Sequence, residues 1–369
     1  MIIFIYGTTG ELIKILPLIK LVPEKQQMRI STNQQPDQLE GFQRETNAPQ
    51  ADLVVANGRH GHDLEKFSDM LFWLKDVLAN YPRTRRLLKA QIKKHGRQNV
   101  IVVVHGDTVT TVLGAMAGRL SRLKVAHIES GLRSGNWRHP FPEELDRRMV
   151  SKIARLHFAP GNVPVENLKS ARVKGEIIDT KLNTVLDSLR LAQKSQGGIS
   201  EIKKMPLKFF VVSIHRNELL TQPKELDSIL KKIVNKAQEV PCIFLDHPIT
   251  KETIKAKGMD KMLDSPTVIR VKKLRYYQFI GLASKADFIV TDSGGLQEES
   301  AYLGIPCLVH RLTTERQEGL GKNVILSQYN PAVVDAFLKN PYQYKTKPLS
   351  NDISPSKIIY GYFAKNNYC

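Results

Sequence analysis

Acidic residues and histidines follow apolar stretches at several places, where buried strands are expected to end. The residues concerned are Asp107, Glu129, His215, His247 and the segment DSGG at 292–295. Carboxylates and imidazoles can exchange protons with a bound ligand. In open α/β sheets, ligands bind beyond the carboxyl ends of the strands. We therefore interpret these residues as parts of one site rather than as unrelated helix caps.

The segment HGDTVTT at residues 105–111 also has a purely structural interpretation. Asp107 could cap a helix expected over residues 108–123, because Asp is one of the residues that favour the N-cap position. Taken alone, the segment favours the cap. A chemical role for Asp107 therefore depends on the rest of the chain.

The segment TDSGGLQEES at residues 291–300 is the clearest local pattern. A strand is expected to end at Val290, and a helix follows the two glycines. Gly294 and Gly295 would let the backbone approach a ligand closely, and the free N–H groups of a helix start suit a phosphate. The segment is neither a Walker loop nor a Rossmann glycine motif. An ordinary capped turn is the alternative interpretation.

Apolar segments typical of buried strands alternate with segments of helical periodicity. The expected strands lie within residues 2–7, 99–107, 124–130, 208–216, 241–248, 286–295 and 306–311. This order predicts an α/β fold with parallel sheets covered by helices on both faces. A polar stretch over 162–205 separates two such series. We therefore expect two domains, residues 1–170 and 171–351.

Composition excludes several classes of protein. The hydrophobic share of 41% and the charged share of 25% are ordinary for a folded protein. No apolar run reaches the roughly 18 residues of a membrane-spanning helix. Cys242, Cys307 and Cys369 have neither paired nor metal-ligand spacing. We therefore expect a reducing compartment, the cytoplasm, and no metal site.

The net charge of +19 is the unusual property. A basic surface attracts polyanions, but no nucleic-acid-binding module is recognisable, so nucleic acid is not an expected partner. The charge is densest at Arg83, Arg85, Arg86, Lys89, Lys93, Lys94 and Arg97, shortly after the apolar Leu71, Phe72, Trp73 and Leu74. Such a pair of segments can form a membrane-surface patch. We favour a buried helix followed by a solvated one.

Several segments together resemble the non-hydrolysing UDP-N-acetylglucosamine 2-epimerases. They are YGTTGELIKILPLI, HGDTVTTVLGAMAGRL, VAHIESGLRSG, PFPEELDRRMVSKIARLHFAP, SIHRNE and TDSGGLQEESAYLGIPCLVHRLTTERQEG. The resemblance covers residues 100–330, with the N-terminal segment in register. It implies the GT-B fold, in which two Rossmann-like domains bind the nucleotide sugar in their cleft and residues 352–369 return to the first domain. We also expect a homodimer.

The resemblance assigns roles to residues that match the family's motifs. It implies that Asp107, Glu129, Glu143 and His215 are catalytic. The implied substrate-binding residues are Lys14, His247, Phe279, Ser293, Gly294, Gly295, Glu299 and Arg316. Phe279 would stack on uracil, Glu299 would bind the ribose hydroxyls, and Arg316 would lie on the phosphate side.

The implied activity interconverts UDP-N-acetylglucosamine and UDP-N-acetylmannosamine for surface polysaccharide synthesis, with no cofactor and no metal. The chain departs from the family pattern at Thr9, where the family has an arginine near the diphosphate, and at Gly10, where it has a proline. Residues 31–37 also lack the segment that the family associates with a second, allosteric UDP-N-acetylglucosamine.

Three other functions stay open at this point. A hydrolysing 2-epimerase is a close variant. A GT-B glycosyltransferase with a UDP-sugar donor and a lipid-linked or polysaccharide acceptor is favoured by the missing arginine and by the apolar residues 71–73. Nucleic-acid binding rests on charge alone.

Overall fold

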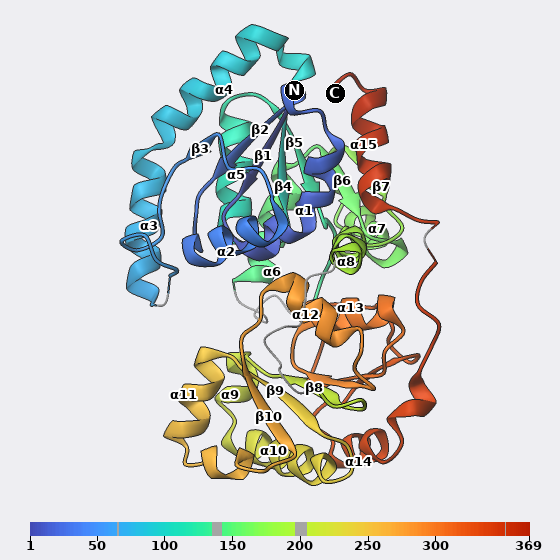
Figure 1. Cartoon of the computed structure of the whole chain (residues 1–369). Helices are drawn as coiled ribbons and strands as arrows, with labels where there is room; N and C mark the ends of the chain where they lie inside the picture. The colour runs from blue at the N-terminus through green and yellow to red at the C-terminus, as the bar shows by residue number, and fades with distance from the viewer. Residues whose placement is uncertain (65, 135–141, 196–204, 351) are drawn as a thin grey trace. The chain divides into compact units, whose positions relative to one another are not determined.

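The computed structural model describes residues 1–64, 66–134, 142–195, 205–350 and 352–369. They form two compact units, one of Met1–Leu191 and Asn351–Cys369, the other of Ala192–Ser350 (Figure 1). Both units are parallel sheets with helices. The predicted α/β class is confirmed.

The first unit contains a seven-stranded parallel sheet with the order β3-β2-β1-β4-β5-β6-β7. The strands are β1 (Ile2–Tyr6), β2 (Gln27–Ser31), β3 (Leu53–Val54), β4 (Ile101–His105), β5 (Lys124–Ile128), β6 (Leu156–Ala159) and β7 (Glu176–Asp179). The helices are α1 (Thr9–Leu21), η1 (Glu24–Gln26), α2 (Pro36–Thr46), α3 (Phe67–Ala79), α4 (Tyr81–His95), η2 (Arg97–Asn99), α5 (Val109–Leu120), α6 (Glu143–Ile153), α7 (Asn162–Ser170), α8 (Val185–Lys194) and α15 (Pro355–Lys365).

The central strands β1 and β4 are buried along their whole length, as their unbroken aliphatic sequences predict. Two glycines on α5 let this helix pack closely on β4 and on its neighbours β1 and β5. A β-carbon on Gly114 would lie 2.9 Å from Val104 Cγ1, and one on Gly118 would lie 2.8 Å from Val125 Cγ2. The close packing of α5 fixes the segment before it, which contains Asp107.

The polar stretch 162–205, expected to join two domains, does contain the boundary between the units, but its described part also forms α7, β7 and α8. Strand β7 pairs with β6 along its length, so it belongs to the sheet of the first unit. The boundary between the units therefore follows Leu191 rather than residue 170. The stretch is polar because β7 is an only partly buried edge strand.

The C-terminal helix α15 belongs to the first unit and packs against α1 (Figure 1). The Phe363 ring is fully buried, and its centroid lies 5.4 Å from that of Phe158 in an edge-to-face contact. The N-terminal amino group donates a hydrogen bond of 2.5 Å to the carbonyl of Tyr368. Both ends of the chain are thus fastened to the same unit.

The second unit contains a six-stranded parallel sheet with the order β10-β9-β8-β11-β12-β13. The strands are β8 (Phe210–Ser213), β9 (Cys242–Asp246), β10 (Val268–Lys272), β11 (Ile289–Thr291), β12 (Cys307–Val309) and β13 (Val324–Leu326). The helices are α9 (Asn217–Leu220), α10 (Pro223–Ala237), α11 (Pro248–Ala256), η3 (Asp260–Leu263), α12 (Tyr276–Ala283), α13 (Gly294–Leu303), α14 (Pro331–Lys339) and η4 (Pro341–Tyr344).

We expect Phe363→Ala to lower the free energy of unfolding by about 3–5 kcal/mol, because it removes a buried ring and leaves a cavity. Urea denaturation measures this difference. Lys365→Ala is the matched change at an exposed position of the same helix and should stay within about 0.5 kcal/mol of the unmodified chain. Equal effects of the two substitutions would contradict a structural role for α15.

Candidate active site

The segment after β4 decides between the two interpretations of Asp107. Helix α5 is capped by Thr108, whose Oγ1 accepts a hydrogen bond of 3.2 Å from the N–H of Thr111. Asp107 lies one residue before the cap, and its carboxylate forms an ion pair with Arg147 of α6. The cap interpretation of Asp107 is therefore wrong.

Glu11 fixes this segment to the loop after β1. One carboxylate oxygen accepts from the N–H groups of Gly7, at 2.9 Å, and Thr8, at 2.8 Å, while the other accepts from Thr108 Oγ1 at 2.7 Å. Burial raises the pKa of Glu11, and these hydrogen bonds oppose the shift. Thr9, at the start of α1, donates its N–H to Gln35 Oε1 at 3.1 Å. The role of Glu11 was not predicted from the sequence.

Two residues that were predicted separately, Lys14 and Glu129, are in direct contact. Lys14 Nζ lies 2.5 Å from Glu129 Oε2, and Asn183 Nδ2 donates to the same oxygen at 2.5 Å. His105 Nε2 lies 3.8 Å from it. Glu129 has φ of +65°, a conformation that non-glycine residues rarely adopt. The structure thus holds this carboxylate between a lysine and an amide, in a strained turn.

Helix α6 carries Glu143 in its first turn, and one face continues with Asp146 and Arg147 at the spacing i, i+3, i+4. Asp107 and Glu143 both act electrostatically on Asp146. Glu144 is fully buried and is paired with Arg148 at 3.0 Å. Of these residues, the sequence indicated only Asp107 and Glu143.

In the second unit, Asp292 joins the ends of β8 and β11. Its buried carboxylate accepts hydrogen bonds from the N–H groups of His215, at 3.0 Å, and Arg216, at 2.8 Å. Burial raises the pKa of Asp292, and the two backbone hydrogen bonds oppose the shift. Asp292 therefore orients the backbone on either side of His215.

Helix α13 begins directly after this carboxylate. Ser293 is its N-cap, and the first N–H groups of the helix, those of Gly294 and Gly295, have no partner within the helix. A β-carbon on Gly294 would lie 3.1 Å from Glu315 Oε1, whereas the nearest atom to one on Gly295 would be Ser293 Oγ, at 3.8 Å. Gly294 thus leaves room for the Glu315 carboxylate, and the N–H groups of this helix start are donors of the kind that can bind a phosphate.

Glu299 interacts with a tyrosine hydroxyl, whereas Arg316 is paired with another carboxylate. The Tyr276 hydroxyl interacts with Glu299, and burial together with this carboxylate raises the pKa of Tyr276. Tyr276 lies one turn before the half-buried Phe279 on α12, so the contact links the helix of Phe279 to α13. Arg316 Nη1 is paired with Glu298 Oε1 at 3.0 Å. The Arg316 charge is therefore partly neutralised within the protein.

His215 and His247 lie side by side, with ring centroids 4.5 Å apart, and His247 Nε2 lies 3.1 Å from Ser213 Oγ. Burial, the largest cause, lowers the pKa of His215 to about 4 and that of His247 to about 3. Both rings are therefore neutral near pH 7, and His215 can offer an N–H group there but no full positive charge.

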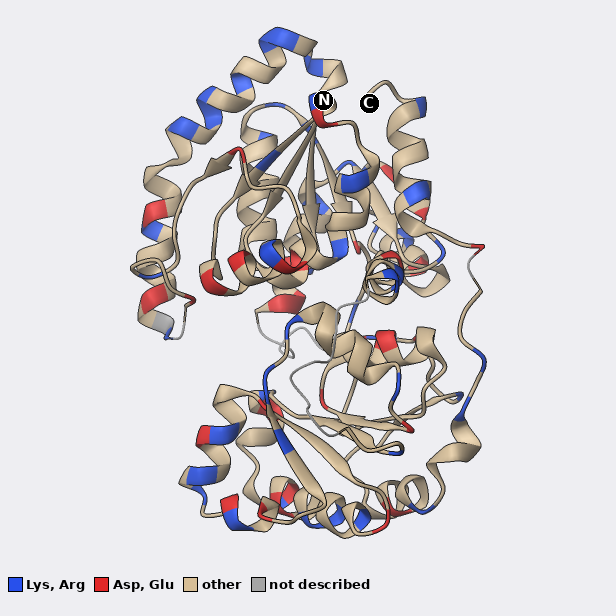
Figure 2. Ribbon diagram, viewed as in Figure 1, with Lys and Arg blue, Asp and Glu red and all other residues tan. Residues whose placement is uncertain are grey.

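The apolar residues before the basic helix do not form one exposed patch. Trp73 is fully buried and donates its indole N–H to the carbonyl of Thr32 at 2.7 Å, whereas Leu71 and Phe72 are exposed. The Arg59 guanidinium lies 3.8 Å from the Phe72 ring centroid. Lys and Arg are spread along α4 (Figure 2). The alternative of a membrane-surface patch, which was not favoured, therefore lacks its tryptophan.

The described residues provide neither a membrane-spanning helix nor a cluster of metal ligands. In the part of the chain that the structure describes, no helix has both the length and the apolar composition to cross a membrane. Within the same residues, no group of three or more His, Cys, Asp and Glu side chains is arranged to hold a metal ion.

Two Rossmann-like units with polar groups at the carboxyl ends of their strands define a protein of GT-B type. Within that class, the chain belongs to the UDP-N-acetylglucosamine 2-epimerase family, whose family model matches residues 85–361. The UDP-N-acetylglucosamine 2-epimerase of Bacillus subtilis is 34% identical over 283 residues, which cover 72% of this chain and 73% of that protein. That of Methanococcus maripaludis is 30% identical over 86% of this chain and 85% of its own length.

Solved structures agree with this assignment. The UDP-GlcNAc 2-epimerase from Neisseria meningitidis bound to UDP-GlcNAc is 27% identical and superimposes with a TM-score of 0.80, covering 99% of both chains. The Methanocaldococcus jannaschii enzyme in complex with UDP-GlcNAc and UDP is 25% identical, with a TM-score of 0.78 and coverage of 98% of this chain and 99% of that one. The predicted family is confirmed.

The histidine pair should make the protein sensitive to acid. Between pH 6.5 and about 4, the unfolded chain binds protons at His215 and His247 that the folded chain excludes, so the free energy of unfolding falls as pH falls through this range. We expect His247→Gln to make this dependence shallower, as measured by urea denaturation at pH 4.5 and 7. The exposed His60→Gln is the control. Identical slopes for His247→Gln and the unmodified chain would contradict the assignment.

Proposed function

We propose that the chain is a nucleotide-sugar 2-epimerase that interconverts UDP-N-acetylglucosamine and UDP-N-acetylmannosamine. The observation that carries the proposal is the match to epimerases across both units, together with carboxylates in the first unit and a free helix start in the second. UDP-GlcNAc is the ligand bound in the Neisseria meningitidis structure. The product would serve surface polysaccharide synthesis in the cytoplasm. Free thiols at Cys242, Cys307 and Cys369 are compatible with that compartment.

The chemistry explains why several carboxylates are required. The proton on C2 of the sugar is not acidic in the ground state, because no carbonyl group is adjacent to it. Breaking the anomeric C–O bond gives C1 oxocarbenium character, and the C2 proton can then be removed. UDP leaves, a 2-acetamidoglucal forms, and UDP adds again while a proton is delivered to the opposite face of C2. Removal and delivery on opposite faces require two acid/base groups.

The two units take different roles in this proposal. In the second unit, the N–H groups of Gly294 and Gly295 at the α13 start would bind the diphosphate, and Phe279 and Glu299 would bind uracil and ribose. Because Arg316 is already paired with Glu298, we assign most of the diphosphate stabilisation to the helix start. His215 would donate one N–H to the departing phosphate.

The first unit would supply the proton transfers. The charges of Asp107 and Glu143 both act on the carboxyl group of Asp146. The Glu129 carboxylate is held by Lys14 and Asn183. A GT-B glycosyltransferase is the alternative function, and it is not favoured because the relatives that match most of the chain are 2-epimerases. A hydrolysing epimerase would release the free sugar instead of returning it to UDP.

We expect C2 to acquire deuterium when the purified protein acts on UDP-N-acetylglucosamine in heavy water, as followed by NMR. Asp107→Asn, Glu129→Gln and Glu143→Gln should each lower kcat by roughly 10²–10⁴-fold with little change in UDP affinity, because a positioned acid/base group contributes about that much. Glu166→Gln, an exposed carboxylate of the same unit, is the control. Turnover without deuterium at C2, or near-normal kcat in all three variants, would contradict the proposal.

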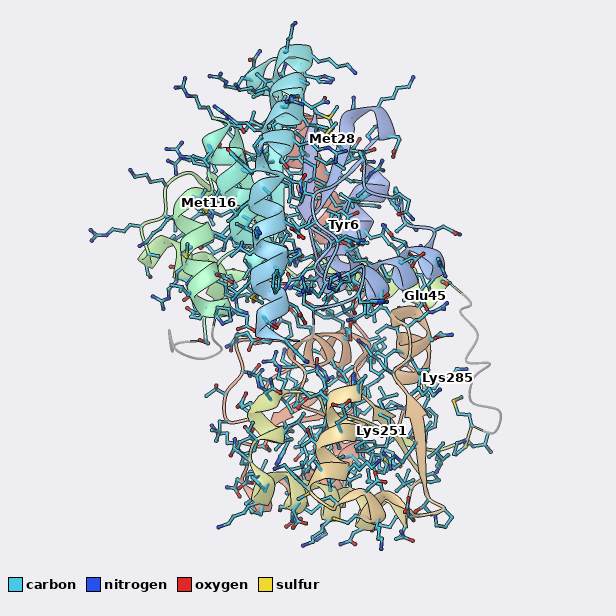
Figure 3. All side chains as sticks on the ribbon, turned by 90° about the vertical axis from the view of Figure 1, so that its left-hand side faces the viewer. Tyr6, Met28, Glu45, Met116, Lys251 and Lys285 are labelled. Carbon is cyan, nitrogen blue, oxygen red and sulfur yellow. The ribbon has the colours of Figure 1, made fainter. Side chains whose placement is uncertain are left out.

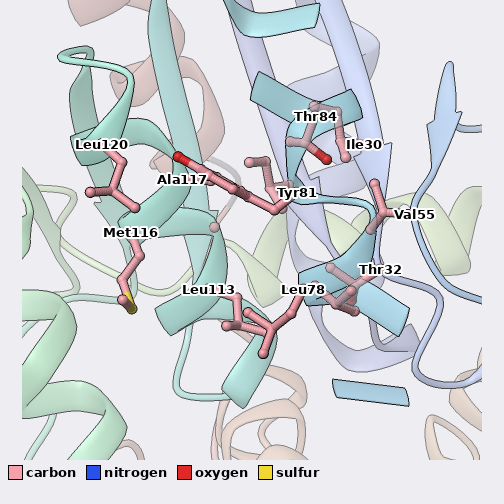
Figure 4. A pocket seen from close by; sticks show the side chains of 13 residues that line it. Ile30, Thr32, Val55, Leu78, Tyr81, Thr84, Leu113, Met116, Ala117 and Leu120 are labelled. Carbon is pink, nitrogen blue, oxygen red and sulfur yellow. The ribbon is translucent and has the colours of Figure 1, made fainter. Parts of the chain in front are cut away.

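A homodimer remains part of the proposed function, and one face of the first unit supports it. A cavity of about 160 Å³ is lined almost entirely by apolar residues from α3, α4, α5 and the sheet (Figure 4). Leu78, Met116 and Leu120 border it and are 57%, 43% and 59% exposed. Figure 3 shows this face with Met116 labelled. A surface on which apolar side chains protrude beside an apolar hollow can pack against the same surface of a second copy, related by a two-fold axis.

We expect the unmodified protein to sediment as a dimer and Leu120→Asp to sediment as a monomer, since the substitution would bury an unpaired charge in the interface. Leu349→Asp, a similarly exposed leucine of the second unit, should leave the dimer intact. A monomeric unmodified protein, or a dimeric Leu120→Asp variant, would rule out this interface. Co-sedimentation with anionic vesicles would identify a membrane as the occupant instead.

A further inference from the structure

Two histidines inside the first sheet take no part in the proposed mechanism. His127 lies on β5 and His157 on β6, and the two residues are paired in the register of the sheet. Both are fully buried. An aliphatic side chain would fill such a position without bringing a polar group that needs a partner. The hydrogen bonds of the two imidazoles therefore indicate what they do.

His127 holds the turn that precedes Asp107. Its Nε2 lies 2.8 Å from the carbonyl oxygen of Gly106, and because a carbonyl can only accept, Nε2 carries the proton and donates. The N–H of Gly106 donates to the carbonyl of Ile128, the residue after His127, at 3.0 Å. Gly106 has φ of +72°, so the chain leaves the extended conformation there. Strand β5 thus fixes both backbone polar groups of the residue before Asp107.

His157 makes the equivalent contact one strand further along the sheet. Its Nδ1 lies 3.2 Å from Ser130 Oγ, and the N–H of Ser130 donates to the carbonyl of Phe158, the residue after His157, at 3.0 Å. The Nε2 of His157 lies 3.2 Å from the carbonyl of Lys174 and therefore carries the proton. In a neutral ring, Nδ1 then accepts from the Ser130 hydroxyl. Strand β6 thus fixes the residue that follows Glu129.

Both imidazoles are neutral near pH 7. Burial, the largest cause, lowers the pKa of His127 to about 3, and it also lowers the pKa of His157. The Nδ1 of His127 is buried and has no hydrogen-bond partner among the described residues, so a proton on it would be a buried, unpaired charge. The two rings therefore supply directional hydrogen bonds and add no charge beside the carboxylates of the site.

We propose that His127 and His157 are positioning residues of the epimerase, which set the placement of Asp107 and Glu129, respectively. The inference rests on the proposed function, because that function assigns proton transfer to these two carboxylates. Each carboxylate belongs to a turn with a positive φ angle, and an imidazole of the next strand holds that turn. A displacement of about 1 Å in a reacting group can cost roughly 10²-fold in rate. A hydrogen bond that prevents it supports turnover without taking part in the chemistry.

The first test measures hydrogen exchange and does not use activity. His127→Leu removes the donor to Gly106, so the backbone amides of residues 105–111 should exchange about tenfold faster, while those of residues 129–133 should not change. His157→Leu should have the reverse effect on the two segments. Faster exchange of both segments in both variants would indicate a general loss of stability and would overturn the proposal. Unchanged exchange in both variants would overturn it as well.

His310→Leu is the matched control. His310 is a histidine of the second unit that is only 3% exposed, and its Nδ1 lies 2.9 Å from Ser327 Oγ. The substitution removes an equally buried imidazole with a similar hydrogen bond. Exchange in residues 105–111 and 129–133 should match that of the unmodified chain. Faster exchange there would show that the effect does not depend on the contacts of His127 and His157, and it would contradict the inference.

The second test uses conservative substitutions to separate positioning from folding. The amide of Gln can place an N–H near the position of Nε2, and the amide of Asn can place an oxygen near that of Nδ1. His127→Gln and His157→Asn should therefore keep kcat near that of the unmodified enzyme. The two leucine variants should lower kcat by about 10²-fold with little change in UDP affinity. Conservative variants as slow as the leucine variants, or leucine variants with normal kcat, would overturn the assignment.

The two tests distinguish the inference from the proposed function. An unmodified protein without epimerase turnover would overturn the proposed function, and the exchange measurements would still decide whether each histidine holds its own turn. An active enzyme whose two segments respond alike to both leucine substitutions would overturn the inference and leave the proposed function intact.

Discussion

The hydrogen bonds of the buried Glu11 carboxylate hold the functional edge of the first sheet together. Its two oxygens accept from two backbone N–H groups of the loop after β1 and from hydroxyl groups of Thr8, Thr108 and Thr111. Burying a charged carboxylate is costly unless its lone pairs are satisfied in this way. Because Thr108 is also the cap of α5, the same network fixes the residue before it, Asp107. The position of Asp107, the proposed acid/base group, thus depends on Glu11, a residue to which the proposed mechanism assigns no chemical step.

In the second unit, Asp292 has the same structural role as Glu11 in the first. Asp292 is buried at the end of β11 and accepts hydrogen bonds from two backbone N–H groups that follow β8. Strands β8 and β11 are neighbours in the sheet. In both units a short carboxylate joins the ends of two adjacent parallel strands, where backbone groups would otherwise lack partners. The hydrogen bonds to each carboxylate come mainly from the backbone, so they fix the loops without using the side chains that face outward. Asp107, His215 and Ser293 are therefore held on rigid loops at the carboxyl ends of the strands.

The sequence predicted most of the central strands, because buried parallel strands are unbroken aliphatic runs. It did not predict β2, β3, β6, β7, β10 or β13. Strand β3 has two residues, β7 is partly exposed, and β2 contains the polar residues of QMRIS. Such strands form because a neighbour in the sheet offers hydrogen bonds, and this property is absent from local hydropathy. The same reason made the stretch 162–205 look like a linker.

The residues of the candidate site divide in a similar way. Asp107, Glu129 and Ser293 could be found from sequence because each follows an apolar run. Arg147, Asn183 and Glu11 could not, because their roles depend on contacts with residues 40, 54 and 97 positions away. Hydrogen bonds and ion pairs across such separations are products of the fold. A sequence pattern indicates where a functional group stands, but not the group that orients it.

Within the segment 105–111, Thr108 caps α5 and Asp107 does not, and this difference matters for function. If Asp107 capped α5, its oxygens would be held by backbone N–H groups, which stabilise the charged form and lower basicity. Thr108 takes the cap instead, and Asp107 faces one arginine and, through space, the carboxyl of Asp146. Asp107 thus keeps its carboxylate for contacts beyond its own helix, while the hydroxyl of Thr108 satisfies the backbone of α5.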